Sequence, residues 1–253
     1  MRTIDINCDM GESYGPWKMG HDAEVMPFIT SANVACGGHA GDPNVMAKTV
    51  SLAQQFGVSV GAHPGYPDLP GFGRRALALT PDELQNMLLS QLGSLSAIAH
   101  SQAVELNHIK PHGALYNLAC VDIVTARAVV SAVKAFSTAL PIYCLPGSEL
   151  EEEAKKQGIL AVPEGFVDRA YEPNGLLADR NTPDAVANDP EWAAKQALQL
   201  AMGSVQARNG VTIQLRVDTL CIHGDTPGAP LFAKTVSDAL TKAGFALAAP
   251  RHG

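Results

Sequence analysis

The stretch VELNHIKPHGALYN, residues 104–117, decides the fold because it shows how the strands of this chain end. Its first half is an apolar strand pattern that turns polar as it ends. Pro111 cannot donate to a sheet ladder, so we expect the strand to stop there and His112 and Gly113 to lie in a loop. A lysine such as Lys110 at the end of an otherwise buried strand costs free energy unless something uses its charge. The alternative is a solvent-exposed strand end with a satisfied histidine.

Seven short apolar runs alternate with seven helical patterns along the chain, as judged from hydrophobic period and end signals. The predicted strands are residues 3–8, 32–36, 58–62, 104–110, 142–145, 159–162 and 219–223. The predicted helices are residues 23–30, 43–56, 81–101, 123–136, 149–157, 190–208 and 229–243. Asp42 before Pro43 is a typical helix N-cap, and Thr80 with Glu83 fits a capping box.

Strict alternation of strands and helices indicates an α/β fold with a parallel sheet covered by helices. Seven such units can close into a barrel or stay open as a doubly wound sheet. The polar residues that follow the strands favour an irregular seven-stranded TIM-like barrel. No linker or change in composition divides the chain, so we expect a single domain over residues 1–253.

The composition is that of a folded chain with a large core. Hydrophobic residues make up 46% of the 253 residues and charged residues 17%. The net charge of -7 argues against nucleic acid or an anionic membrane as the main partner. No segment approaches the roughly 18–20 apolar residues that span a bilayer, and the first residues lack a signal-peptide pattern. We therefore expect a cytoplasmic protein.

The five cysteines form no C-x-x-C pair, which argues against a zinc ribbon or a thioredoxin-type site. Most lie in or at the end of apolar strand patterns, so we interpret them as small buried hydrophobic residues. A nucleophilic Cys36 is the alternative, because glycines and His39 follow it.

Polar residues follow six of the seven predicted strands. In α/β barrels and open α/β sheets, ligands bind at the carboxyl ends of the strands, so these side chains are expected to meet there. Carboxylates and imidazoles gathered in a concave site serve metal binding and general acid–base catalysis. The residues in question are Asn7, Asp9, Glu12, Gly38, His39, His63, Lys110, His112, Tyr116, Glu164, Asp168, Arg169, His223 and Asp225.

Two long loops, residues 64–79 and 165–188, carry arginines and can act as lids over an anion. Arg74 and Arg75 lie in the first loop. The simpler interpretation is that both loops are surface excursions. The chain has no G-x-x-x-x-G-K-[ST] phosphate loop, no H-E-x-x-H and no G-x-S-x-G, so ATP, if used, is not held by a common nucleotide motif.

Six blocks in order, spanning residue 4 to about residue 230, resemble the LamB/YcsF family. They are IDINCDMGES, SANVACGGHAGD, VGAHPGYPD with GFGRR, HIKPHGALYN, PEGFVDRAY and LCIHGDTPGA. Cys8 and Met10 stand where family members more often have small or aliphatic core residues. The resemblance implies a fold related to the barrels of glycoside hydrolases and sugar deacetylases.

The resemblance also implies a reaction, that of the A subunit of an ATP-dependent 5-oxoprolinase. 5-Oxoproline, ATP and water would give glutamate, ADP and phosphate, in an assembly with separate B and C subunits. A five-membered lactam is an unreactive amide, and phosphorylation of its carbonyl oxygen would open C5 to attack by water. Such a route needs cationic groups for phosphate, a base for water and a proton donor for the ring nitrogen.

Strand-end position and motif match together suggest roles for these residues. Asp9 and Glu12 are candidates for water activation or metal binding. His39, His63 and His112 are candidates for acid–base or metal roles, and the metal, magnesium or a similar divalent ion, would bind among Asp9, His39 and His63. Lys110 and Arg169 would hold phosphate or the substrate carboxylate. Glu164, Asp168, His223 and Asp225 complete the polar ring, and the substrate-binding or phosphate-binding candidates are Asn7, Gly38, Arg74, Arg75 and Tyr116.

Two other functions fit the same residues. One is a metal-dependent deacetylase or amidase that acts without ATP. The other is a non-catalytic subunit that binds the lactam and delivers it to its partners. The sequence leaves assembly into a homo-oligomer open.

Overall fold

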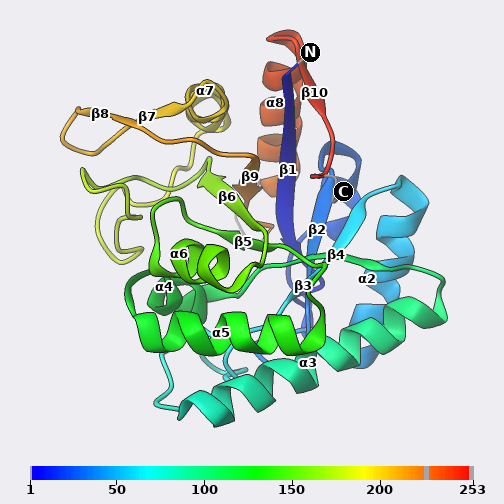
Figure 1. Cartoon of the computed structure of the whole chain (residues 1–253). Helices are drawn as coiled ribbons and strands as arrows, with labels where there is room; N and C mark the ends of the chain where they lie inside the picture. Colours follow the sequence, from blue (N-terminus) through cyan, green and yellow to red (C-terminus); the bar gives the residue numbers. More distant parts are fainter. Residues whose placement is uncertain (1, 225–227, 251–253) are drawn as a thin grey trace.

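Seven parallel strands close into a barrel in the computed structural model, which describes residues 2–224 and 228–250 (Figure 1). The strands pair in the order β1-β2-β3-β4-β5-β6-β9, and β9 pairs back with β1. Their bounds are β1 Arg2–Met10, β2 Ser31–Ala35, β3 Ser59–His63, β4 Leu106–Ile109, β5 Ile142–Cys144, β6 Ala161–Phe166 and β9 Thr219–Ile222. The predicted irregular α/β barrel is confirmed.

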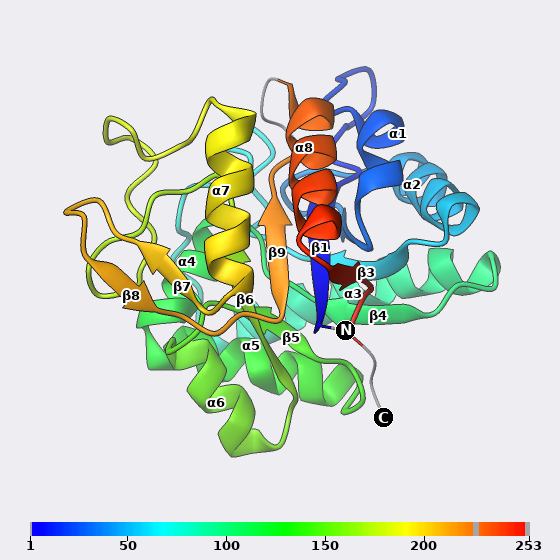
Figure 2. The same cartoon turned by 90° about the horizontal axis from the view of Figure 1, so that it is seen from above.

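Helices surround the barrel (Figure 2). Their bounds are α1 Asp22–Val25, η1 Met26–Phe28, α2 Pro43–Phe56, α3 Pro81–Ser101, α4 Gly113–Val121, α5 Ile123–Phe136, α6 Glu149–Gln157, α7 Pro190–Ala201 and α8 Ala229–Lys242. The predicted caps are present, since the Asp42 side chain accepts from the backbone of α2 and Thr80 forms a capping box with Glu83. None of the helices in the described ranges is long and apolar enough to cross a membrane.

Three segments differ from the predicted elements. Residues 113–121 form α4 rather than a loop, because Gly113 takes a φ of 53° and the apolar residues after it bury a helical face. The first predicted helix is split into α1 and η1, with Pro27 in the first turn of η1. Helix α7 ends at Ala201, because Gly203 takes a φ of 92° and the chain enters a hairpin.

That hairpin joins β7 (Ser204–Gln206) to β8 (Thr212–Gln214), and it projects beside α7 (Figure 2). A further strand, β10 (Phe245–Leu247), pairs with the first residues of β1 outside the barrel. Neither feature was predicted, because runs of three residues are too short to give a hydrophobic period.

The barrel interior is polar, whereas the hydrophobic core lies between the barrel and its helices. Strand β1 alternates apolar and polar residues, and successive residues of a strand point to opposite faces. Asp5, Asn7 and Asp9 form hydrogen bonds across the barrel interior. The apolar residues of β1 belong instead to the buried hydrophobic cluster; they are Ile4, Ile6, Cys8 and Met10.

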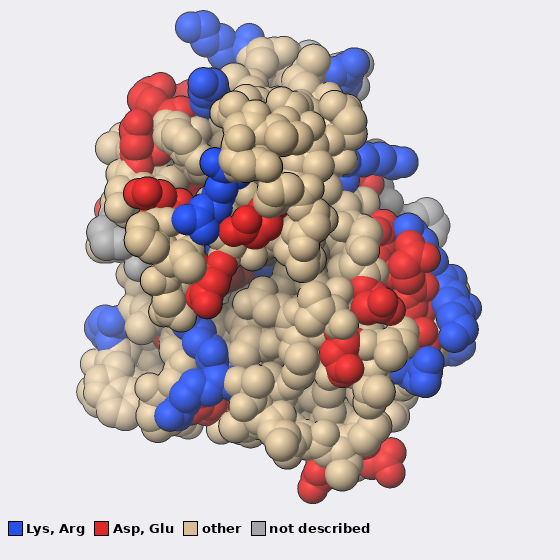
Figure 3. Space-filling model, turned by 90° about the vertical axis from the view of Figure 1, so that its left-hand side faces the viewer, with Lys and Arg blue, Asp and Glu red and all other residues tan. Residues whose placement is uncertain are grey.

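The surface is mixed in charge. On the face shown in Figure 3, Lys and Arg side chains are interspersed with Asp and Glu side chains among uncharged residues. Such a surface differs from the continuous basic stripe that is typical of a nucleic-acid-binding face.

Candidate active site

The lowest layer of the barrel interior is built around Asp5. Its carboxylate accepts hydrogen bonds from four hydroxyl groups, those of Thr30 (2.5 Å), Ser31 (2.8 Å), Thr219 (2.6 Å) and Tyr143 (3.1 Å). Burial raises the pKa of Asp5, although these four donors favour the ionised form. Because four hydroxyl groups donate to the Asp5 carboxylate, its position is fixed, and it anchors the hydrogen-bond network that leads to the pocket.

The next layer centres on Asn7. Its Nδ2 donates to Glu164 Oε1 (3.0 Å) and to Thr219 Oγ1 (2.7 Å), and its Oδ1 accepts from Asn33 Nδ2 (2.7 Å). Asn33 Nδ2 lies 2.9 Å from Asp9 Oδ1 as well. Because Asn33 uses one amide nitrogen for both contacts, its orientation determines where the Asp9 carboxylate is held.

His108 sets the orientation of Asn33. Its Nε2 lies 2.6 Å from Asn33 Oδ1, which fixes that atom as the acceptor end of the amide. The His108 ring stacks on Tyr143, with centroids 4.0 Å apart and planes 5° apart. On the other side lies Gly61, where a Cβ would come within 2.1 Å of His108 Nε2. Gly61 is therefore required for His108 to reach Asn33.

Lys110 is the internal counter-ion of the site. Its Nζ lies 2.8 Å from Glu164 Oε1, 3.1 Å from Asp9 Oδ1, 3.1 Å from Asn7 Oδ1 and 3.0 Å from Cys221 Sγ. Burial alone would lower the pKa of Lys110, but the neighbouring Asp9 and Glu164 carboxylates raise it well above its usual value. An ammonium group has three donors, so these contacts leave none over for a ligand.

Two histidine rings face each other through one nitrogen each. His63 Nδ1 lies 2.8 Å from the Lys110 carbonyl oxygen, and His112 Nε2 lies 2.8 Å from the Phe72 carbonyl oxygen. A carbonyl can only accept, so each of these nitrogens carries a proton. The remaining nitrogens, His63 Nε2 and His112 Nδ1, are 3.0 Å apart. If both rings are neutral, two lone pairs meet at this distance and repel; a proton on one ring or a metal ion between them removes the repulsion.

Carboxylates adjoin the same two nitrogens. Asp9 Oδ2 lies 3.4 Å from His63 Nε2, and Glu12 Oε1 lies 3.5 Å from His112 Nδ1. Burial opposes ionisation of Asp9, but His63 and Lys110 hold its pKa well below the usual range. Burial and His63 lower the pKa of His112. An ionised Asp9 and a neutral His112 are the forms that ligate a metal ion.

His39 completes this cluster. Its ring stacks on His112 with centroids 3.6 Å apart, and its Nε2 lies 3.1 Å from Glu12 Oε1. One ligand atom from each of Glu12, His39, His63 and His112 lies within 4.8 Å of the others. Imidazole and carboxylate donors together suit zinc or a similar transition ion, whereas magnesium prefers oxygen ligands. The cluster therefore fits a divalent metal.

Phe72 belongs to the site although no role was assigned to it from the sequence within the GFGRR block. Its backbone takes a φ of 53°, which is uncommon for a residue other than glycine. This conformation accompanies the hydrogen bond from His112 to its carbonyl, and the Phe72 ring packs edge-on against His39 and His112. The loop of residues 64–79 thus supports the histidine cluster as well as covering it.

Asp168 and His223 form a second acid–base pair. Both Asp168 carboxylate oxygens lie within 2.9 Å of His223 Nδ1, which fixes that nitrogen as the protonated one. Burial opposes ionisation of Asp168, but His223 lowers its pKa. His223 Nε2 is left for a ligand, and a nitrogen of His223 lies within 4.8 Å of Asp9 and Cys221 ligand atoms. Asp9 therefore stands between the two histidine groups.

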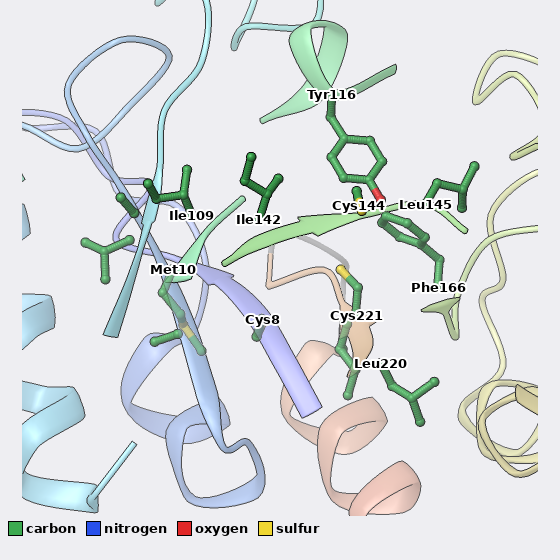
Figure 4. Packing of buried hydrophobic residues seen from close by; sticks show 14 of the residues in the cluster. Cys8, Met10, Ile109, Tyr116, Ile142, Cys144, Leu145, Phe166, Leu220 and Cys221 are labelled. Carbon is green, nitrogen blue, oxygen red and sulfur yellow. The ribbon is translucent and has the colours of Figure 1, made fainter. Parts of the chain in front are cut away.

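A pocket of about 580 Å³ opens over both groups. Its polar side includes Asp9, Glu12, His63, Lys110, His112 and His223. Tyr116, Leu145 and Phe166 line its apolar side, and Figure 4 shows these three side chains near one another. The Tyr116 and Phe166 rings meet edge to face, with centroids 5.7 Å apart. Arg74, Arg169 and Arg180 line the pocket too.

Four buried polar atoms of this region have no hydrogen-bond partner among the described residues. They are His39 Nδ1, Tyr116 Oη, Glu164 Oε2 and Arg169 Nε. Burial and the Glu164 carboxylate raise the pKa of Tyr116 well above its usual value, although no hydrogen bond of acceptable geometry joins the two groups. Since buried polar atoms are nearly always paired, this concentration of unpaired atoms indicates a site built for a ligand.

The model of the LamB/YcsF family matches residues 4–252 of this chain. The chain belongs to the LamB/YcsF family. A relative from Chloroflexus aurantiacus, named as the A subunit of 5-oxoprolinase, is 52% identical over 253 residues, which is 100% of both chains. The crystal structure of a lactam utilization protein from Thermus thermophilus is 49% identical, covers 98% of this chain and 100% of that chain, and superposes with a TM-score of 0.94.

A more distant structure shares the fold alone. A proposed cellobiose-phosphate cleavage protein from Enterococcus faecalis V583 is 12% identical, with a TM-score of 0.57 and coverage of 98% of this chain and 97% of that chain. A fold shared at so low an identity does not identify a function, so function has to be argued from the residues that fill this LamB/YcsF pocket.

Most residues that the sequence singled out in this LamB/YcsF chain meet at the pocket. Asn7, His39, Glu164 and Asp168 lie directly behind the lining residues and hold them through the contacts described above. Five residues of the barrel interior were given no role from the sequence, namely Asp5, Asn33, His108, Tyr143 and Thr219. The apolar–polar alternation of β1 was the signal that could have found the first of them.

Three further residues singled out from the sequence, Arg75, Gly38 and Cys36, do not line the pocket. Arg75 pairs with Asp68, its side chain is 65% exposed, and it does not line the pocket. Gly38 packs where a Cβ would lie 2.5 Å from Gln91 Oε1, so its role is close packing. Burial raises the pKa of Cys36 to about 12, which keeps it a thiol and disfavours a nucleophilic role. Asp225 lies outside the described residues.

Proposed function

We propose that this chain is the subunit of an ATP-dependent 5-oxoprolinase that opens the lactam of 5-oxoproline to glutamate, in an assembly with separate B and C subunits. The observation that carries the proposal is the pairing, in one pocket, of the Asp168–His223 pair with a histidine–carboxylate cluster at Asp9. Relatives of about half identity over the full length, named as the A subunit of 5-oxoprolinase, support the choice of substrate.

Hydrolysis of a lactam needs a base that takes a proton from water and an acid that protonates the leaving ring nitrogen. Asp9 is ionised and lies beside His63, so it can accept the proton of the attacking water. His223 is held by Asp168 with Nε2 turned to the pocket, so in its protonated form it can donate to the ring nitrogen. Lys110 keeps Asp9 ionised throughout.

A divalent metal is part of this proposal. Glu12, His63 and His112 would hold it, with Asp9 or His39 as a further ligand, and such an ion would polarise the lactam carbonyl and acidify a bound water. Of the divalent ions that the sequence left open, magnesium or a similar ion, the donor set favours a zinc-type ion.

ATP would supply the driving force that a stable lactam requires. Phosphorylation of the lactam oxygen would make C5 more electrophilic toward water. Protonation of the ring nitrogen would then let the C5–N bond break, and hydrolysis of the resulting acyl phosphate by a second water would release glutamate and phosphate. Arginines at the pocket would stabilise the added negative charge. We place the ATP-binding step in the assembly rather than at a particular residue of this chain.

The test uses lysate from a strain that lacks this chain, supplied with 5-oxoproline and ATP. Glutamate should form only after the purified protein is added, and only while ATP is present. The metal-ligand cluster favours one alternative, an amidase or deacetylase that works without ATP. Hydrolysis of a simple amide by the isolated, metal-loaded protein, with no glutamate from 5-oxoproline, would establish that alternative.

A further inference from the structure

Arg169 is a buried cation with an unused donor. It follows strand β6, only 5% of the residue is exposed, and its Nη2 donates to the Ala178 carbonyl at 2.5 Å. Its Nε has no hydrogen-bond partner among the described residues. Burial and the nearby Arg180 lower its pKa to about 10. A buried guanidinium donor without a partner costs free energy in the absence of a ligand.

Arg180 brings a second positive charge to the same place. It lines the pocket beside Arg169, and within residues 2–224 and 228–250 it has no hydrogen bond or ion pair. The two positively charged guanidinium groups lie on the same side of the pocket and repel each other. An anion bound between them would be attracted to both groups and would offset this repulsion.

Asp168 offsets part of this charge, because its carboxylate opposes the lowering of the Arg169 pKa by burial, and because both arginines join His223 in lowering the pKa of Asp168. The nearby carboxylates are nevertheless hydrogen-bonded to other groups. Asp168 uses both carboxylate oxygens on His223, and Glu164 Oε1 is engaged by Lys110. Lys110 in turn is surrounded by its own partners and has no donor left for a ligand. From the sequence, Lys110 and Arg169 were expected to bind the anion together. The structure leaves Arg169 and Arg180 as the groups that can bind it.

We infer that Arg169 and Arg180 form the receptor for an oxyanion of the substrate, the carboxylate of a lactam acid or a phosphoryl group placed on it. This inference rests on the proposed function, because it names the part of the substrate that this wall of the pocket recognises. Guanidinium groups match a carboxylate or phosphate through paired N–H donors. Since Asp168 precedes Arg169 directly, an anion held there lies next to the residue that orients His223.

The test compares two lactams that differ only in the anion. Binding of 5-oxoproline, of 2-pyrrolidinone, which lacks the carboxylate, and of inorganic phosphate is measured by calorimetry for the full chain and for Arg180→Gln. The second variant is Arg169→Lys, which keeps the positive charge but loses the paired N–H donors of the guanidinium group. Arg216→Gln is the matched control, because the Arg216 side chain is 85% exposed and pairs with Asp218.

The inference expects Arg180→Gln and Arg169→Lys to weaken 5-oxoproline binding about 10- to 100-fold while 2-pyrrolidinone binding stays unchanged. If the anion is phosphoryl, phosphate binding falls instead and 5-oxoproline binding is kept. Unchanged binding of both anions in both variants would overturn the inference, even if the lysate assay forms glutamate. Conversely, a protein that binds phosphate through Arg180 but forms no glutamate would keep the oxyanion receptor and remove the proposed function.

Discussion

His63 Nε2 and His112 Nδ1 face each other at 3.0 Å, and the other nitrogen of each ring donates a hydrogen bond to a backbone carbonyl oxygen. When both rings are neutral, this arrangement brings two lone pairs together at the pocket. With the Glu12 and Asp9 carboxylates adjoining, the contact is stabilised by positive charge there, either a proton on one imidazole ring or a metal ion. Much of the chemistry proposed for this chain follows from that one contact.

We expect the purified protein to bind about one equivalent of Co²⁺ or Zn²⁺ at this contact. His112→Gln should weaken the affinity at least about 10-fold, because it removes an imidazole ligand. The visible spectrum of bound Co²⁺ gives the coordination directly. The control is His100→Gln, whose parent side chain is 81% exposed. A Co²⁺ spectrum that is the same in His112→Gln and in wild type would contradict the assignment.

We expect Asn33→Ala to lower kcat about 10- to 100-fold with little change in KM. Asn33 holds Asp9 but lies beneath the pocket, so its loss misplaces the carboxylate and leaves the lactam contacts in place. His108→Gln should have a smaller effect in the same direction, because a glutamine amide can still donate to Asn33. A KM increase with normal kcat in Asn33→Ala would show that the residue acts on substrate binding instead.

We expect Gly61→Ala to destabilise the fold by about 2 kcal/mol or more, since its Cβ would lie 2.1 Å from His108 Nε2. Gly93→Ala in α3 is the matched control, because nothing lies within 4 Å of its added Cβ, and it should stabilise the protein by about 0.5–1 kcal/mol. Denaturant unfolding gives both values. Gly61→Ala should lower the free energy of unfolding by less when His108 is also replaced by alanine. An equal loss with and without His108→Ala would mean that the His108 ring is not what the added Cβ collides with.

We expect the five cysteines to be unreactive in the folded protein. All are buried, and burial raises the pKa of Cys36 and of Cys120 to about 12, so little thiolate exists at pH 8. A thiol-reactive chromogen should report five thiols after denaturation and almost none before it. One rapidly reacting thiol in the native protein, lost in Cys36→Ser, would restore the nucleophile hypothesis.

The barrel could be predicted from the sequence because each strand is a short apolar run between well-marked helix caps, such as Asp42 and Thr80. The pocket could be predicted because parallel strands bring their carboxyl ends together. Helix α4 could not, since Pro111 and Gly113 are typical of a loop, and only packing in the folded chain shows that the helix starts there.

The residues beneath the pocket were harder to foresee. Asp5, Asn33 and His108 lie within strands, where a polar residue is usually taken as an exposed position. Their partners come from strands far apart in the sequence, as in the contact of Asp5 with Thr219, and the closure of the barrel alone brings them together. The unpaired state of Arg169 Nε is a property of three-dimensional surroundings that no motif encodes.

The central claim is that His223, oriented by Asp168, catalyses the opening of 5-oxoproline. The most direct measurement is the rate of glutamate formation in lysate lacking this chain, with 5-oxoproline and ATP, after addition of wild type or His223→Gln at equal concentration. Wild type should restore the rate, His223→Gln should lower it at least about 100-fold, and His21→Gln, at an exposed surface position, should match wild type. Full restoration by His223→Gln would contradict the account.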